Sequence, residues 1–167
     1  QSKQFDLAIV NLPIDINFGK PYMPIESREI YVECNFDLKM FCVIPEIHPL
    51  SEKNILTFND ISGQNFVSFP NGTYIRYEID RILEKNHVNC RVKLETRSTA
   101  DIYQYVKHGA GISIVFPFLQ FGEKPIPGIL FKPVKSNLKL SLAIMRSKRK
   151  ELSLVAKKFL EIIGQFS

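Results

Sequence analysis

The sequence has few cysteines and few histidines. Its 167 residues include only Cys34, Cys42 and Cys90, an odd number without a C-x-x-C pair. That spacing argues against a disulfide framework and favours buried, reduced thiols in a cytoplasmic protein. The three histidines share no metal-ligand spacing with the cysteines, so we expect neither a metal site nor a cofactor.

Long apolar runs and catalytic motifs are also missing. No stretch approaches the roughly 20 apolar residues that cross a bilayer. The G-x-S-x-G, Walker and H-E-x-x-H motifs are absent. Gly109-Ala-Gly111 follows a predicted helix and precedes a predicted strand, the reverse of a dinucleotide-binding loop, so we interpret it as a helix stop. We therefore expect a protein that is not an enzyme.

The start of the chain shows no secretion signal. It begins with Gln1, and a strand is predicted from Phe5 to Val10, with no basic segment and apolar segment before it. We expect a part of a longer protein, although a processed secreted protein can also begin with Gln.

Positive charge is concentrated near the end of the sequence. Residues 132–167 contain nine Lys or Arg but only two acids, a local charge of +7, so with a total of +5 the remainder carries −2. The cluster Arg146, Lys148, Arg149 and Lys150 has two interpretations. It could neutralise nucleic-acid phosphates, or it could be a solvated turn between a strand and a helix, which we favour.

Strands and helices alternate through the middle of the chain. We predict strands at 65–69, 90–95 and 112–116, a helix from Thr73 to about Lys85, and a helix capped by Ser98 or Thr99 that stops at Gly109. Alternation at this spacing predicts a parallel sheet with helices on both faces, and hence an α/β fold.

The flanking regions predict further strands at 29–35, 38–44, 129–131 and 138–146. A helix is predicted over 150–166, with one apolar stripe made by Leu152, Val155, Ala156, Phe159, Ile163 and Phe166. We expect this stripe to face the core.

Small polar side chains follow the strands of the alternating region. Ligands of open α/β sheets bind beyond the carboxyl ends of the strands, and free N–H groups at helix N-termini suit a carboxylate or another anion. The candidates for binding are Ser68, Phe69, Thr73, Arg97, Ser98, Thr99 and Phe116. The hydroxyls have an alternative role as helix caps, and Phe69, Tyr74, Phe116 and Phe118 have an alternative role as core residues.

Four segments, in order, resemble the LysR family of bacterial transcription regulators. They are Phe41-Cys-Val-Ile-Pro-Glu-Ile-His-Pro-Leu50, Asp60-Ile-Ser-Gly63, Arg76 with Ile79-Asp80, and Val106-Lys-His-Gly-Ala-Gly-Ile-Ser-Ile-Val115-Phe-Pro117. The last segment and Glu95-Thr96 look most like the branch that senses amino acids or opines.

The resemblance implies a type 2 periplasmic-binding-protein-like fold, with two Rossmann-like lobes, each with a parallel-core sheet, around a cleft. Residues 1–43 and 136–167 would form the first lobe, and residues 44–135 the second. The family resemblance also places Asn11 among the ligand-contacting positions. Family members have about 70 more residues of the first lobe before the strand that contains Asp6, and a DNA-binding helix-turn-helix before those residues. The first lobe would therefore be incomplete here, and DNA binding would lie outside this chain.

By resemblance, the chain is the effector-binding domain of a cytoplasmic regulator that forms a homodimer or homotetramer and binds a small metabolite. The metabolite would be amino-acid-like or another carboxylate. Two alternatives remain: an extracytoplasmic solute-binding protein of the same fold, and an enzyme of this fold such as a prephenate dehydratase. The enzyme would need a paired acid and base, which the sequence does not show.

Overall fold

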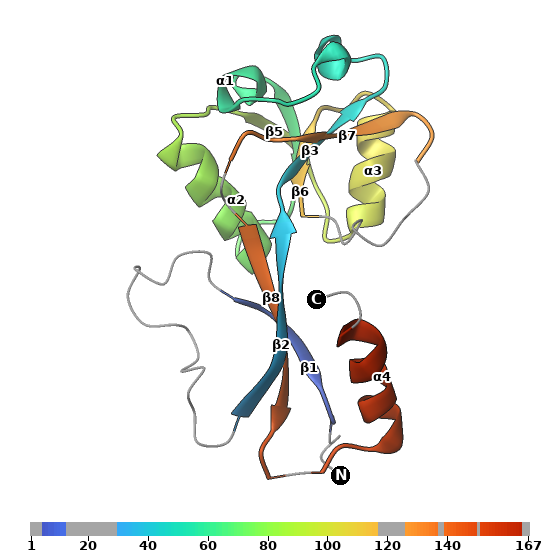
Figure 1. The fold of residues 1–167 in the computed structure, drawn as a ribbon. Coiled ribbons are helices and arrows are strands. Elements are labelled where there is room, and N and C mark those ends of the chain that lie inside the picture. Colours follow the sequence, from blue (N-terminus) through green and yellow to red (C-terminus); the bar gives the residue numbers. More distant parts are fainter. Residues whose placement is uncertain (1–4, 13–29, 117–125, 137–138, 150, 165–167) are drawn as a thin grey trace. The chain divides into compact units, whose positions relative to one another are not determined.

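The computed structural model describes residues 5–12, 30–116, 126–136, 139–149 and 151–164. The chain divides into two compact units (Figure 1). Unit 1 comprises Gln1–Leu38 and Lys139–Ser167, and unit 2 comprises Lys39–Leu138. The predicted lobes were divided at residues 43/44 and 135/136, whereas the units are divided at 38/39 and 138/139.

Unit 1 contains a three-stranded sheet and one helix. The strands are β1 (Ala8–Leu12), β2 (Ile30–Lys39) and β8 (Lys139–Ser147), in the order β1-β8-β2. β1 and β8 pair antiparallel, with Ile9 opposite Ile144, so this pair is not part of a parallel core. Helix α4 (Leu154–Gly164) follows the sheet in sequence.

Unit 2 has a mixed arrangement of strands. β3 (Phe41–Pro45) lies between β6 (Ser113–Val115) and β7 (Ile129–Pro133), and both neighbours run antiparallel to it. β4 (Asn65–Ser68) and β5 (Arg91–Glu95) pair in parallel. A parallel bridge between Phe66 and Ile112 connects β4 to the residue before β6. The predicted parallel order of the three strands is therefore confirmed, and β3 adds an antiparallel neighbour to it.

The helices of unit 2 begin at the residues that their capping signals predict. Thr73 is the N-cap of α2 (Tyr74–Lys85), and Ser98, not Thr99, is the N-cap of α3 (Thr99–Lys107). Gly109 has a φ of +79° just after α3, which confirms the predicted helix stop.

Two shorter helical segments precede β4. In α1 (Phe58–Ile61) the Asp60 carboxylate accepts hydrogen bonds of 2.8 Å from the Thr57 N–H and hydroxyl, as in a capping box. Bonds from Lys53 and Thr57 lower the pKa of Asp60 to about 2. In η1 (Pro49–Glu52) the His48 Nδ1 accepts from the Leu50 N–H at 3.2 Å, so the His-Pro-Leu motif builds a turn.

The core of unit 2 lies between its strands and helices. Most of its fully buried side chains come from β3, β4, α2, α3 and β6, and include Ile44, Phe66, Ile79, Ile102 and Ile114. Burying such a side chain contributes about 1.5–3 kcal/mol. Of the three parallel strands that precede the candidate residues, β4 and β6 are therefore buried in the apolar core, whereas β5 is exposed along its whole length.

Some predicted bounds near the edges of the units were wrong. The two strands expected at 29–35 and 38–44 are present, but β2 continues to Lys39 and β3 begins at Phe41. The helix expected from Lys150 begins at Leu154, because Ser153 provides its cap: the Ser153 Oγ accepts from the Ala156 N–H at 3.2 Å.

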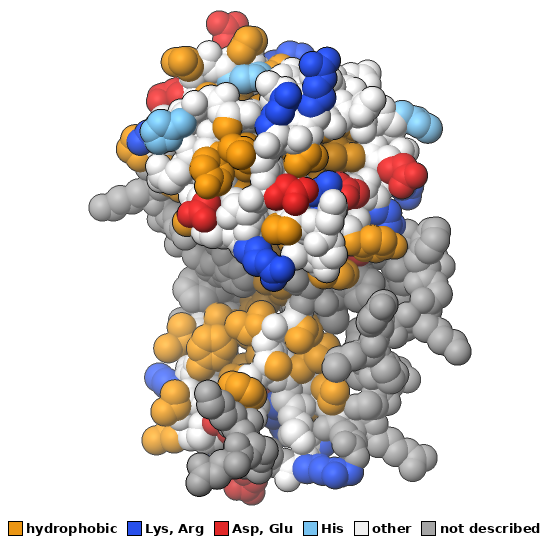
Figure 2. All heavy atoms as spheres, turned by 180° about the vertical axis from the view of Figure 1, so that it is seen from behind, with side chains coloured by type: hydrophobic (Ala, Val, Ile, Leu, Met, Phe, Trp, Pro, Cys, Tyr) orange, Lys and Arg blue, Asp and Glu red, His pale blue; other side chains and the backbone are white. Residues whose placement is uncertain are grey.

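The predicted apolar stripe of α4 is mostly not buried. Ala156 is buried, but Val155 is 79% exposed and Phe159 is 37% exposed, while Phe166 lies outside the described residues. The described part of unit 1 provides a sheet of only three strands, which covers little of this helix. Figure 2 shows hydrophobic side chains gathered on one face of this unit.

Cys42 is buried, Cys34 and Cys90 are partly buried, and all three are free thiols. Burial raises the pKa of Cys42 strongly, and burial likewise raises the pKa of Cys90 to about 11. These two thiols are therefore protonated at neutral pH. Among the helices that the structure describes, none has the length and apolar character of a membrane span.

Candidate functional site

The carboxyl ends of three strands of unit 2 meet at one edge. Ser68 at the end of β4 is paired with Glu95 at the end of β5, and the Thr96 N–H donates to the Ser68 carbonyl at 3.0 Å. Because Ile112 bridges Phe66 in parallel, the chain after β6 reaches this same edge at Phe116. The predicted convergence of the strand ends within unit 2 is therefore observed.

Ser68 has a buried hydroxyl near the end of β4. Its side chain is 1% exposed, and its Oγ has no partner in the described part of the chain. A buried hydroxyl without a partner costs on the order of 1–3 kcal/mol. Ser113, at the start of β6, has the same property. Ser68 differs from Ser113 because it ends its strand, at the edge where the helices begin.

The first helix N-terminus at this edge is that of α2. The Thr73 hydroxyl donates to the Pro70 carbonyl at 2.8 Å and accepts from the Arg76 N–H at 3.4 Å. Thr73 is therefore a helix cap, as its alternative role predicted. Phe69, immediately after β4, is buried, so its ring belongs to the core of unit 2.

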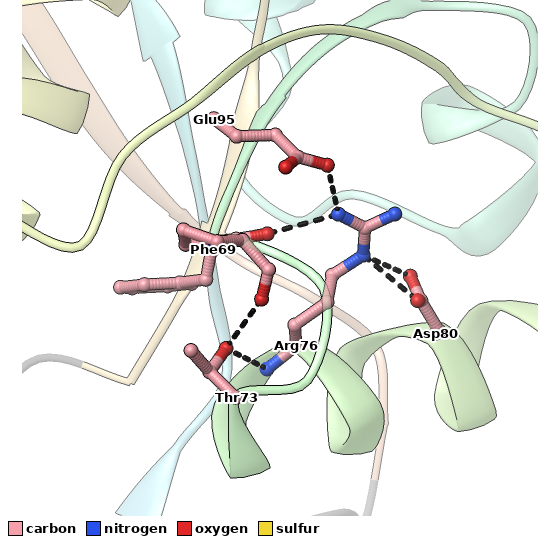
Figure 3. Close-up of polar contacts among 6 residues, drawn as sticks. Phe69, Thr73, Arg76, Asp80 and Glu95 are labelled. Carbon is pink, nitrogen blue, oxygen red and sulfur yellow. Dashed lines mark hydrogen bonds and ion pairs between the residues drawn. The ribbon is translucent and has the colours of Figure 1, made fainter.

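Arg76 connects α2 to the ends of both parallel strands (Figure 3). Its Nε donates to the two Asp80 carboxylate oxygens at 2.8 and 2.7 Å. Its Nη1 donates to the Phe69 carbonyl at 2.9 Å and to the Glu95 carboxylate at 2.7 Å. A planar guanidinium can satisfy such diverging partners, whereas the point charge of a lysine cannot. Arg76 thus holds the turn after β4 against the end of β5.

The second helix N-terminus is that of α3, and its loop is also bonded within the chain. The Ser98 Oγ accepts from the Asp101 N–H at 3.3 Å. The Thr96 Oγ1 accepts from the Ser98 N–H at 3.2 Å and donates to the Asp101 carboxylate at 3.1 Å. Thr96 and Ser98 therefore shape the loop and have little capacity left for a ligand.

Two candidates in this loop keep their polar groups available. Arg97 and Thr99 are both exposed. Within the residues that the structure describes, neither side chain forms an ion pair or a hydrogen bond. A guanidinium and a hydroxyl beside the N-terminus of α3 form a suitable arrangement for an anion.

The other candidates lie elsewhere or are only partly described. Asn11 lies in β1 of unit 1, opposite Leu142, and its side chain is not among those described. Phe116 is partly buried at the end of β6, and Tyr74 is partly buried in the first turn of α2. Phe118 lies outside the described residues. No cluster of potential metal ligands occurs in the described ranges.

The sequence indicated some residues of this edge but not their contacts. Arg76 and Asp80 were noted for their family spacing, and the ion pair between them is an ordinary i,i+4 pair. The link from Arg76 to Glu95 spans 19 residues and has no local sequence signal. The unpartnered hydroxyl of Ser113 was also missed, because strand periodicity does not show which buried serine lacks a partner.

The sequence profile described as the LysR substrate binding domain matches residues 1–167. The transcriptional activator protein LysR of Escherichia coli (strain K12) is 37% identical over 76 residues, which cover 46% of this chain and 24% of that protein. The matched region is thus about a quarter of that relative's length.

Solved structures of similar fold include the CcmR regulatory domain of Synechocystis PCC6803 in complex with 2-PG, with a TM-score of 0.69 at 20% identity, over 94% of this chain and 71% of that one. The effector-binding domain of QuiR in complex with shikimate gives a TM-score of 0.67 at 16% identity, over 94% and 69%. At these identities the likeness shows the fold alone.

Proposed function

Because the chain belongs to the LysR substrate-binding domain family, we propose that it senses a small carboxylate, amino-acid-like or otherwise, for a bacterial LysR-type transcription regulator. The ligand binds at the edge of unit 2 where β4, β5 and β6 end. In the whole protein, which is cytoplasmic and forms a homodimer or homotetramer, a helix-turn-helix outside this sequence contacts DNA. The chain itself catalyses no reaction.

The observation that carries this proposal is the buried, unpartnered hydroxyl of Ser68. Such a group is stabilised when a ligand supplies its missing hydrogen bond. Arg97 lies in the loop after β5 and Thr99 is the first residue of α3, and neither side chain has a polar partner among the described residues. Asn11, Phe69, Thr73, Ser98 and Phe116 remain proposed contacts, and Thr73 and Ser98 would act mainly through the N–H groups of the helices that they cap.

Regulation requires only a difference in affinity between two conformations of the protein. A ligand that binds one conformation tenfold more tightly shifts the equilibrium by about 1.4 kcal/mol. A few hydrogen bonds at the strand ends supply a difference of that size.

A thermal-shift screen tests the proposal, with a panel of amino acids and short carboxylic acids as probes. We expect at least one of these probes to raise the melting temperature of the chain, because a ligand that binds only the folded state stabilises it. No shift with any carboxylate, together with a shift for uncharged or cationic probes, would overturn the choice of ligand class.

Two serine variants then locate the site. Ser68→Ala should abolish the shift produced by the probe, while Ser113→Ala should keep it. Both substitutions remove a buried hydroxyl without a partner, so each should leave the unliganded melting temperature unchanged or slightly higher. If Ser113→Ala reduces probe binding as much as Ser68→Ala does, the strand ends are not the site.

An arginine pair tests the charge at the site. Arg97→Gln should weaken the binding of a carboxylate probe at least tenfold, measured by calorimetric titration. Arg91→Gln is the matched control, because Arg91 is an exposed arginine at the opposite end of β5. Equal weakening in both variants would show a general effect of net charge and not a contact with the ligand.

A further inference from the structure

A basic hollow opens on unit 1 at the start of α4. Its volume is about 360 Å³, and its lining residues are Arg146, Lys148, Arg149, Glu151, Leu152 and Lys157. They come from the end of β8, the turn that follows and the first helical turn of α4 (Figure 1). Four of the six are cationic and one is acidic, so the lining of the hollow is mainly basic.

Arg146 is held in place by contacts outside the hollow. It forms an ion pair with Glu33 of β2, and its guanidinium carbon lies 4.9 Å from the centre of the Tyr31 ring. A guanidinium that is paired on one side and stacked on an aromatic ring has little freedom to turn away. Arg146 therefore forms a fixed wall of the hollow, and Glu33 offsets its charge.

No acidic group of the described residues pairs with the two lysines of the lining. Within the described residues, the Lys148 and Lys157 ammonium groups have no ion pair and no hydrogen bond, although Lys158, next to Lys157, pairs with Glu161 at 2.8 Å. Glu151 is the single acidic group of the lining. Like charges gathered around one space repel each other until an anion enters it.

The geometry points to a site for a phosphate-type oxyanion. A phosphate or phosphate ester carries up to two charges and three acceptor oxygens, which match several separate cationic donors better than the single charge of a carboxylate does. The volume leaves room for a diphosphate or for a phosphate with a small organic group. This site shares no residue with the proposed site in unit 2, so either can fail without the other.

The phosphate can come from two sources, a small phosphorylated molecule or the backbone of nucleic acid. Both present the same oxyanion to the hollow. A small phosphorylated ligand would fill the hollow. A nucleic-acid duplex would place only one backbone phosphate at its opening, and its binding affinity would fall steeply with rising salt concentration.

The test is calorimetric titration of the full chain with inorganic pyrophosphate, for the unchanged protein and two double variants. Lys148→Gln with Lys157→Gln removes the two unpaired charges of the hollow. Lys85→Gln with Lys93→Gln is the matched control, since it removes two exposed charges from unit 2. We expect the first variant to weaken pyrophosphate binding at least tenfold and the second to leave it within twofold.

A parallel titration with a DNA duplex of arbitrary sequence, followed by fluorescence anisotropy, identifies the source. If only the variant Lys148→Gln with Lys157→Gln loses binding to the duplex, the site binds nucleic-acid phosphates. If the protein binds pyrophosphate but does not bind the duplex, the site binds a small phosphorylated molecule. Absence of binding to both probes, or equal weakening by both double variants, overturns the proposal. Circular dichroism melts of the variants verify that each is folded.

Discussion

At the scale of single residues, the polar groups at the edge of unit 2 have two different roles. One set of side chains forms hydrogen bonds within the chain and fixes the turns that follow β4 and β5; this set is Thr73, Arg76, Thr96 and Ser98. The Ser68 hydroxyl, by contrast, has no hydrogen-bond partner in the part of the chain that the structure describes. The first set holds the edge of unit 2 in one conformation. A site that is already ordered loses less conformational entropy when a ligand binds.

Arg76 is the residue on which this rigidity depends most. We expect Arg76→Lys to destabilise the chain by about 1–3 kcal/mol, because an ammonium cannot reach Asp80, Glu95 and the Phe69 carbonyl together. Urea unfolding followed by circular dichroism measures the change. Arg91→Lys, on the exposed strand β5, should change stability by less than about 0.5 kcal/mol. An equal loss in both variants would mean that the fork geometry of Arg76 is unimportant.

Local chemistry explains which residue roles could be predicted from the sequence. Thr73 and Ser98 were found as caps, because a cap acts within three residues along the chain. The same residues were also proposed as ligand contacts, and the structure shows that their side chains are occupied by capping. The bond between Arg76 and Glu95 depends on two strands meeting in space, which a single sequence does not report.

At the scale of elements, the glycines between α3 and β6 have different functions. Gly109 has open space around it, so only its φ of +79° requires glycine. Gly111 has a φ of +151°, and a Cβ there would lie 2.4 Å from the Asn65 carbonyl oxygen. That close approach accompanies the hydrogen bond of 2.9 Å from the Ile112 N–H to the same oxygen. The sequence indicated a helix stop, which describes Gly109 but misses the packing role of Gly111.

Alanine substitutions separate these two roles. We expect Gly111→Ala to cost at least about 3 kcal/mol, because it adds a clash with the β4 backbone to the strain in φ. Gly109→Ala should cost about 1 kcal/mol, the cost of strain alone. Denaturation midpoints of the two variants provide the measurement. Similar losses for both would contradict the close contact between β4 and the segment before β6.

Elements with strong periodicity and clear caps were predicted well, and the others were not. The start of α2 and the start and stop of α3 were found within a residue. The boundary between β2 and β3 was missed, because Phe36 and Leu38 continue the alternation with polar residues and no Gly or Pro separates the two strands. The apolar face of α4 was predicted to be buried but is mostly exposed. Periodicity identifies which residues share a face, but it does not show whether another part of the protein covers that face.

At the scale of the whole molecule, buried apolar side chains are distributed unevenly between the two units. Unit 2 contains most of the fully buried residues of the described chain, from Cys42 to Val115. In unit 1, large side chains such as Phe5, Ile9 and Leu154 are exposed. Composition alone could not show this uneven distribution, because the total apolar content is ordinary for a globular protein.

This uneven core predicts different local stability in two helices of similar length. Helix α3 (Thr99–Lys107) buries Ile102 and Val106 completely, whereas α4 (Leu154–Gly164) buries only Ala156 among its described residues. A buried branched side chain contributes about 1.5–3 kcal/mol, so opening α4 should require less free energy than opening α3. We therefore expect the amides of α4 to exchange with solvent deuterium at least tenfold faster, as measured by mass spectrometry after correction for intrinsic rates. Equal protection of the two helices would show that α4 is covered in solution, for instance by self-association through its apolar face, and dilution of the sample would then restore the difference.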